Sequence, residues 1–138
     1  MKNIAVISGG YSNESLISKE SVKTILKHLD SSLYNLWHIR IDDKGWKLLN
    51  GAKETDVNRD NFTVEDNDRV ITFDFAFIII HGTPGEDGKL QSYFDMLKIP
   101  YNTPNHLVST LTFNKWACNT LLKSLGYNVA ASAILRPK

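Results

Sequence analysis

The sequence predicts an α/β fold in which a mainly parallel sheet is flanked by helices. Residues 4–8 and 75–80 are short apolar, β-branched runs, which are typical of strands buried on both faces. A glycine-rich loop follows each run, and a segment with apolar residues at helical spacing follows each loop. Strands that alternate with helices in this way favour a small doubly wound, Rossmann-like domain.

The first third of the chain shows this alternation directly. Residues 11–30 place apolar side chains on one helical face, namely Ile17, Val22, Ile25, Leu26 and Leu29. We expect Ser12 or Asn13 to be the N-cap of this helix. Residues 34–41 then alternate polar and apolar side chains, which predicts a second strand. Strand, helix and strand in this order are the opening of a parallel sheet.

Residues 42–73 follow a different pattern. They are polar, are interrupted by short apolar pieces, and contain an Asn50-Gly51 turn. This pattern predicts small antiparallel strands and loops, a β-rich insertion at an edge of the fold.

The second half of the chain returns to alternating strands and helices. We expect residues 75–80, the most strongly apolar run, to form a central strand of the sheet. After it the sequence predicts a helix over 88–97 and a short edge strand over 99–102. Two helical segments follow, over 105–113 and 112–127, and we expect Gly126 to be the C′ residue that ends the second. A final strand is predicted over 128–136.

Composition excludes several classes of function. The chain has 138 residues, a net charge of +1 and 42% apolar residues, which suits one soluble domain. Scattered charges give no electrostatic reason for binding nucleic acid or an anionic membrane. No segment approaches the roughly 20 apolar residues of a membrane span, so we expect a cytoplasmic protein. Cys118 is the single cysteine and has no disulfide partner, and its helical surroundings favour a core position.

Two loops stand where doubly wound sheets bind ligands, beyond the carboxyl ends of strands. Residues 8–15 contain Gly9 and Gly10, which let the backbone approach a ligand, although the dinucleotide fingerprint is absent. Glu14 in this loop has two interpretations. It could interact with the dipole of the helix that follows, or it could anchor a cationic group such as an amine.

The second loop, residues 81–88, carries one histidine and two carboxylates. His81 ends a buried strand, and an imidazole there could bind a carboxylate or pass a proton. Glu86 could orient that ring, or it could simply cap the next helix, which is the role that we expect for Asp87. One histidine with two acids is too small a ligand set for zinc, and no calcium loop is present, so we expect no metal site.

At this point the residues match a known family. Residues 81–101, "HGTPGEDGKLQSYFDMLKIPY", resemble the HGxxGEDGxxQG signature of D-alanine–D-alanine ligases, with Ser92 in place of the last glycine. Residues 4–18 resemble the family's opening, a glycine pair followed by S-x-E, but Leu16 stands where a second acid is frequent. Residues 111–115, "LTFNK", resemble its M-D-K segment.

The resemblance implies an enzyme that joins two D-alanines for peptidoglycan synthesis. In such ligases ATP phosphorylates the first D-alanine, the amine of the second attacks, and Mg²⁺ holds the phosphates. Carried over by motif, Glu14 and His81 would be the catalytic residues. Glu14 would anchor the D-alanine ammonium, Ser18 would lie near it, and His81 and Glu86 would line the D-alanine pocket. Lys115 would reach ATP phosphates, although outside the family it would be an ordinary solvated helix charge.

The resemblance also implies a division of the chain. Residues 1–111 would be a pre-ATP-grasp domain that holds one side of the substrate pocket, and residues 112–138 would begin the ATP-grasp portion. Because most ATP-binding groups would lie outside these residues, we expect no ligase activity from the chain alone. The resemblance also implies D-alanine as ligand and a homodimer as one assembly. The alternatives are a non-enzymatic binding or dimerisation module, or the same domain of another ATP-grasp carboxylate–amine ligase.

Overall fold

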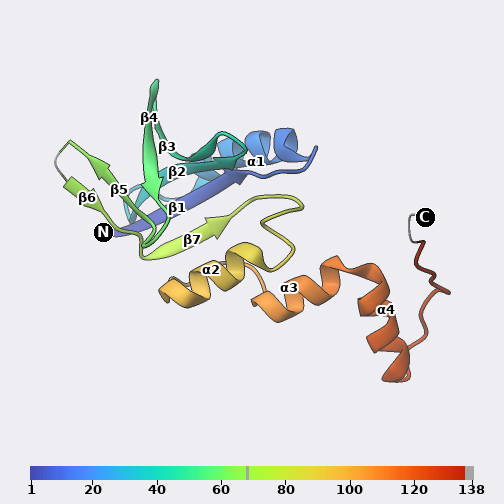
Figure 1. The fold of residues 1–138 in the computed structure, drawn as a ribbon. Helices are drawn as coiled ribbons and strands as arrows, with labels where there is room; N and C mark the ends of the chain where they lie inside the picture. Colours follow the sequence, from blue (N-terminus) through green and yellow to red (C-terminus); the bar gives the residue numbers. More distant parts are fainter. Residues whose placement is uncertain (68, 136–138) are drawn as a thin grey trace.

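A computed structural model describes residues 1–67 and 69–135. Within them the chain forms one seven-stranded sheet and four helices, shown in Figure 1. The strands are β1 (Lys2–Gly9), β2 (Tyr34–Asp42), β3 (Gly45–Asn50), β4 (Lys53–Asn58), β5 (Thr63–Asp66), β6 (Arg69–Ile71) and β7 (Phe75–Ile78). The helices are α1 (Ser15–His28), α2 (Lys89–Leu97), α3 (His106–Phe113) and α4 (Lys115–Ser124).

The sheet is mixed, with strand order β6-β5-β4-β3-β2-β1-β7. β1 pairs in parallel with β2 on one side and with β7 on the other. The pairs from β2 to β6 are all antiparallel. The predicted α/β class is therefore confirmed. The β-rich segment is not a separate appendage, because β3 extends the parallel strands directly through β2 and the turn at Gly51 returns β4 beside it.

The prediction that residues 75–80 form a central strand was wrong. β1 is the central parallel strand, and β7 ends the sheet with a single parallel bridge between Ala76 and Tyr101 on its outer side. The expected strand over 99–102 is reduced to this bridge. The Asn102 side chain takes the place of further backbone pairing, accepting from Ile78 N at 2.7 Å and donating to Ile78 O at 3.2 Å.

The expected strand over 128–136 was also wrong in its described part. Residues 127–135 contain no strand, and Leu135 is 94% exposed. Apolar, β-branched residues alone do not make a strand, because a strand also needs a neighbour that offers hydrogen-bonding groups. Arg136 lies outside the described residues. α4 has no buried side chain, so Cys118 is half-buried and not part of the core.

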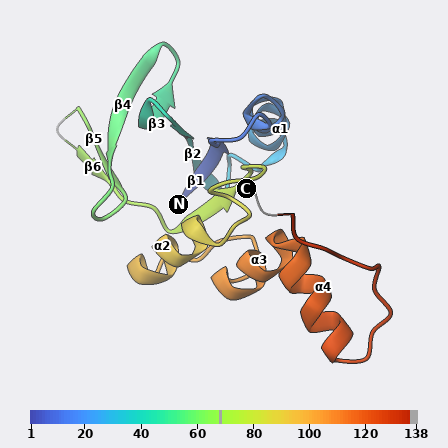
Figure 2. The same cartoon turned by 45° about the vertical axis from the view of Figure 1, so that its right-hand side comes forward.

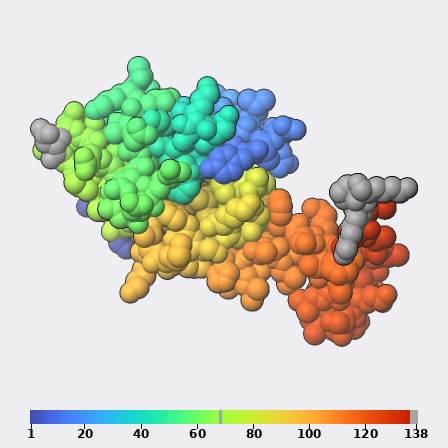
Figure 3. Space-filling view, viewed as in Figure 1, coloured from blue at the N-terminus to red at the C-terminus, as the bar shows by residue number. Residues whose placement is uncertain are grey.

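Asparagine side chains cap α3 and α4 and determine where these two helices begin. The Asn105 side chain accepts from Val108 N at 3.0 Å and starts α3, and the Asn114 side chain accepts from Ala117 N at 3.0 Å and starts α4. The helix predicted over 112–127 is therefore shorter at its beginning. Gly126, with φ of +86°, lies just past its end as expected. Figure 3 shows α4 projecting from the body of the domain.

The two faces of the sheet carry separate apolar clusters. On one face Ile4 and Val6 of β1 pack against Val22 of α1. On the other face Ile7 of β1 belongs to a larger cluster that includes Phe94 of α2. Side chains alternate along a strand, so α1 and α2 must cover opposite faces, as Figures 1 and 2 show.

Phe62 is the centre of an aromatic group in the larger cluster. Its ring centroid lies 4.9 Å from that of Phe94, 5.1 Å from that of Phe73 and 6.1 Å from that of Tyr93. Trp46 approaches Tyr93 edge-on at 5.2 Å. Phe62 has a φ of +52°, which is unfavourable for a bulky residue, and its packing in this group offsets that strain. The antiparallel segment thus supplies the surface on which α2 rests.

Replacing Phe94 should test this support. Phe94→Ala is expected to lower the free energy of unfolding by about 3–5 kcal/mol, because it removes a fully buried ring from the aromatic group. Met96→Ala, at a position 76% exposed on the same helix, is the matched control and should change stability by about 0.5 kcal/mol or less. Urea unfolding followed by circular dichroism measures both, and equal effects would contradict the assigned core.

A second test uses the ionisation of Tyr93. Burial, together with the Asp60 carboxylate, raises the pKa of Tyr93 from 10.0 to about 12. The folded state therefore holds this proton more tightly, so its contribution to stability is complete below pH 10 and is lost as the pH rises toward 12. Tyr93→Phe cannot ionise there and should lose less stability than the unaltered chain between pH 10 and pH 12. Urea unfolding measures both proteins, and equal losses would contradict the shift.

Candidate functional site

The two loops singled out by the sequence lie side by side. β1 and β7 are parallel neighbours, so their carboxyl ends meet at one edge of the sheet. Tyr11 N donates to Thr83 O at 2.9 Å, and Ser12 Oγ donates to His81 O at 3.0 Å. Ser12 therefore joins the loops and does not cap α1, whose N-cap is Glu14 without a side-chain cap bond. The expected Ser12 or Asn13 cap was wrong.

Gly10 is required for this contact between the loops of residues 8–15 and 81–88. It has a φ of +106°, and a Cβ there would lie 2.7 Å from Ile80 Cγ2 and 3.1 Å from Thr83 O. Any larger residue there would force the loops apart, so Gly10 serves loop-to-loop packing, whereas a Cβ on Gly9 would instead meet Ile41 O of β2 at 2.3 Å.

Glu86 closes the second loop on itself. Gly85 N and Glu86 N donate to Gly82 O at 2.9 and 2.8 Å, and Gly82 N donates back to Glu86 Oε2 at 2.7 Å. One carboxylate oxygen is thus occupied by the turn. No hydrogen bond joins Glu86 to the ring of His81 in the described part of the chain, so Glu86 orients the loop and not the imidazole.

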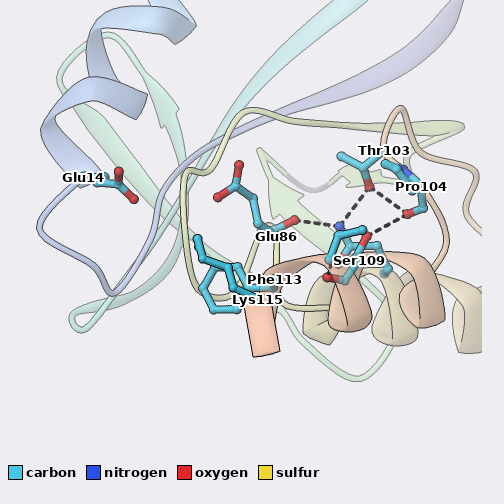
Figure 4. A pocket seen from close by; sticks show the side chains of 10 residues that line it. Glu14, Glu86, Thr103, Pro104, Ser109, Phe113 and Lys115 are labelled. Carbon is cyan, nitrogen blue, oxygen red and sulfur yellow. Dashed lines mark hydrogen bonds between the residues drawn. The ribbon is translucent and has the colours of Figure 1, made fainter. Parts of the chain in front are cut away.

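An open cavity of about 480 Å³ lies between these loops and the α3–α4 region. Figure 4 shows Glu14 approaching it from the start of α1 and Glu86 from the opposite loop, with Lys115 beside Phe113. Polar groups complete the wall, from Gln91, Thr103, Ser109 and Thr112. The cavity therefore brings two carboxylates and one ammonium together from three separate motifs, which suits a small ligand carrying both signs of charge.

His81 faces a different cavity. Its side chain lines a second space of about 490 Å³ beside α1, together with Ser21, Thr24, Ile25 and residues 77–80. Glu86 and Gly85 line both cavities. The structure thus brings Glu14, Glu86 and Lys115 to one cavity, whereas His81 lines the second cavity.

Ser18 lies in neither cavity. Its side chain is fully buried, accepts from Gly9 N at 2.9 Å and donates to Ile79 O at 2.9 Å. These bonds connect the end of β1 to the residue just past β7. Ser18 therefore holds the two strand ends together. Its side chain is fully buried and its hydroxyl proton is donated to Ile79 O, so in this arrangement it does not contact a ligand in either cavity.

Asp87 does not cap α2 as expected. Gly88 occupies the N-cap position, whereas Asp87, one residue earlier, accepts from Lys89 N, the first amide of α2, at 3.4 Å and pairs with Lys89 Nζ at 2.6 Å. Burial acts to raise the pKa of Asp87, but hydrogen bonds from Lys89 and Thr83 outweigh it and hold the pKa below its usual range. A Cβ on Gly88 would lie 2.1 Å from Thr110 Oγ1, so α3 packs too closely for a side-chain cap at that position.

Sequence reasoning missed part of the cavity wall. Gln91, Thr103 and Ser109 line it but were not predicted as site residues. Gln91 stands inside the 81–101 motif, so its place there was a usable signal. Thr103 and Ser109 carry no local signal, because only the packing of α3 against the loop brings them to the cavity.

Removing the Ser18 hydroxyl should destabilise the fold. Ser18→Ala leaves Gly9 N and Ile79 O without their side-chain partner, and each buried group left unpaired costs about 1–3 kcal/mol. Ser21→Ala on the same helix is the matched control, since Ser21 is half-buried and borders only the second cavity. Thermal and urea unfolding distinguish the two variants, and a neutral Ser18→Ala would contradict the assigned connection.

Known proteins resemble this chain in sequence. A ligase of Parabacteroides distasonis is 45% identical over 132 residues, which cover 95% of this chain and 40% of the ligase. One of Azobacteroides pseudotrichonymphae is 43% identical over 139 residues, covering 100% of this chain and 43% of the ligase. Both are D-alanine–D-alanine ligases. The chain thus spans about two fifths of the length of the curated relatives that it matches.

Solved structures agree with these relatives. The D-alanine–D-alanine ligase of Coxiella burnetii matches with a TM-score of 0.82 and 29% identity, over 94% of this chain and 43% of that one. The VanG D-Ala:D-Ser ligase of Enterococcus faecalis matches with a TM-score of 0.81 and 27% identity, over 93% and 43%. Residues 3–104 also match the family described as D-ala D-ala ligase N-terminus. The chain therefore belongs to the D-alanine–D-alanine ligase family, and what it matches is the N-terminal part of those enzymes.

Proposed function

We propose that these residues form one side of the D-alanine pocket of an ATP-dependent D-alanine–D-alanine ligase that makes a peptidoglycan precursor. The observation that carries the proposal is the single cavity shared by Glu14, Glu86 and Lys115, each from a different family motif. D-Alanine is a small zwitterion, and a cavity with both signs of charge complements it.

Glu14 is the group best placed for the substrate ammonium. Its side chain is exposed to the cavity, and among the described residues its carboxylate has no ion-pair partner. A charge-assisted hydrogen bond to an ammonium would therefore not displace an existing one. Glu86 keeps only part of its carboxylate for a ligand, because one oxygen accepts from Gly82 N. A role for the His81 ring requires the ligand to extend past Glu86 toward the second cavity.

Lys115 is proposed to meet phosphate oxygens of ATP. It lies at the first position of α4 and lines the cavity, and a lysine ammonium suits a phosphate as a point charge. A Bacillus anthracis ligase, 25% identical with a TM-score of 0.64, has been solved in complex with ATP. In the proposed reaction ATP supplies the phosphoryl group that activates the carboxylate of the first D-alanine, and Mg²⁺ neutralises its phosphates.

The described residues contain no group of three or more His, Cys, Asp or Glu side chains that could hold a metal ion. The proposal therefore assigns Mg²⁺ to the ATP phosphates and to groups that the longer relatives possess beyond the matched region. This chain's own contribution is to bind and orient D-alanine. D-Serine is the competing second substrate, because one similar structure is a D-Ala:D-Ser ligase.

We also propose a cytoplasmic location and a homodimer. No helix in the described residues has the length and apolar character needed to cross a membrane. The homodimer is proposed from the family resemblance alone.

A chimaera tests the proposed function. Residues 1–138 would replace the matching region of the Parabacteroides distasonis ligase, and formation of D-Ala-D-Ala from D-alanine and MgATP would be measured. Glu14→Gln should lower kcat/KM for D-alanine by about 10- to 150-fold, because a hydrogen bond to a charged group contributes about 1.5–3 kcal/mol. The isolated chain should form no dipeptide.

The matched control is Glu20→Gln, on the same helix. Glu20 is exposed and pairs only with Lys23, so its loss should leave kcat/KM within about twofold. If Glu14→Gln and Glu20→Gln behave alike, Glu14 does not hold the substrate. If the unaltered chimaera forms no dipeptide while it is folded, the proposed function is wrong.

A further inference from the structure

Gln91 is a buried amide in the wall of the charged cavity. Its side chain is 0% exposed, and its Nε2 donates two hydrogen bonds, to Gly85 O at 2.6 Å and to Thr103 Oγ1 at 2.8 Å. Gly85 and Thr103 also line the cavity. One amide nitrogen thus connects the loop that carries Glu86 to the segment that leads into α3. We call these two bonds the Gln91 bridge.

The orientation of this amide is determined by its partners. If the amide were turned over, Oε1 would face Gly85 O, and two acceptors would be in contact without a proton between them. The nitrogen must therefore point at Gly85 O. As a result Oε1 is buried and has no hydrogen-bond partner in the described residues.

An unpaired buried carbonyl makes Gln91 a poor choice for stability alone. A methionine of similar shape would remove that unpaired oxygen, but it would leave Gly85 O and Thr103 Oγ1 without the donor that Gln91 supplies. The side chain is therefore best explained by what its nitrogen holds in place.

The Gln91 bridge determines where Glu86 lies. Gly85 immediately precedes Glu86 and packs closely against Ile80, since a Cβ on Gly85 would be 2.5 Å from Ile80 O. The turn is closed by Gly82 N donating to Glu86 Oε2 at 2.7 Å. Gly85 is therefore held both by its backbone packing on Ile80 and by the hydrogen bond from Gln91.

We propose that Gln91 is a positioning residue, which sets Glu86 and the adjacent cavity wall for the substrate. The bridge itself belongs to this chain, whereas its effect on D-alanine binding rests on the function proposed above. Gln91 would act through Gly85 and Thr103 and would not itself touch the substrate.

Hydrogen exchange in the 138-residue chain tests the bridge without relying on activity. The reporter is the Gly82 amide, which is bonded to Glu86. In Gln91→Met this amide should exchange about tenfold faster, which is the effect of one lost hydrogen bond, while the core amides of β1 keep their rates. Ser92→Ala, at the exposed neighbouring position, is the control and should change neither. Equal acceleration of Gly82 and β1 amides, or no acceleration, would overturn the bridge.

The variant Gln91→Glu keeps the size of the side chain but can gain or lose a proton, so it separates loss of the hydrogen bond from a change in side-chain volume. In Gln91→Glu at neutral pH a carboxylate faces Gly85 O and should loosen the loop, whereas at acidic pH the protonated carboxyl can again donate and restore Gly82 protection. Gln91→Met should show no such restoration. The other ionisable groups of this cavity are Glu14, Glu86 and Lys115, and they are present in every variant, so each is compared with the unaltered chain at the same pH.

Kinetics of the chimaera then test the effect on substrate. Gln91→Met should raise the KM for D-alanine about tenfold and leave the KM for ATP within about twofold, because the bridge lies on the D-alanine side. Unchanged D-alanine kinetics with a loosened Gly82 amide would overturn the positioning role. An inactive but folded unaltered chimaera would refute the proposed function, and hydrogen exchange alone would then decide whether the bridge exists.

Discussion

The parallel pairing of β7 with β1 is the constraint on which the site depends. It places the carboxyl ends of two strands, far apart in sequence, at one edge of the sheet. Ser18 fixes this arrangement by accepting from Gly9 and donating to Ile79. The glycine at position 10 then allows the loop after β1 to reach Thr83. Without this pairing Glu14 and Glu86 would have no common cavity.

Charge and backbone geometry act together in this cavity. Two carboxylates share one space, which is costly unless a cation or a proton is present. Lys115 supplies one positive charge from α4, and a substrate ammonium would supply another. Glu86 is kept in place by its bond from Gly82, so the acidic group presented to the ligand is already ordered before binding.

The antiparallel half of the sheet holds α2, the helix that supplies part of the cavity wall. Phe62, between β4 and β5, packs against Phe94 with ring centroids 4.9 Å apart, and Tyr93 donates to Arg59 O at 2.7 Å. These contacts hold α2, which carries Gln91 on its buried side. A segment predicted as a polar insertion therefore helps to hold α2 beside the loop of residues 81–88.

The α/β class, the two loops and the helix over 88–97 could be predicted from the sequence, because periodicity and glycine turns are local properties. The family followed from the resemblance of residues 4–18, 81–101 and 111–115 to known motifs. Sequence reasoning misplaced residues 75–80 and gave residues 128–136 a strand, since pairing needs a neighbour that no local pattern reveals. It predicted Ser12 or Asn13 and Asp87 as N-caps, whereas Glu14 and Gly88 occupy those positions, Ser12 donates to His81 O, and Asp87 bonds Lys89 through both its backbone N and its Nζ. Only the tertiary structure decided that Ser18 is internal, that His81 faces a second cavity and that Gln91 bridges the wall, because each depends on which groups meet across the folded chain.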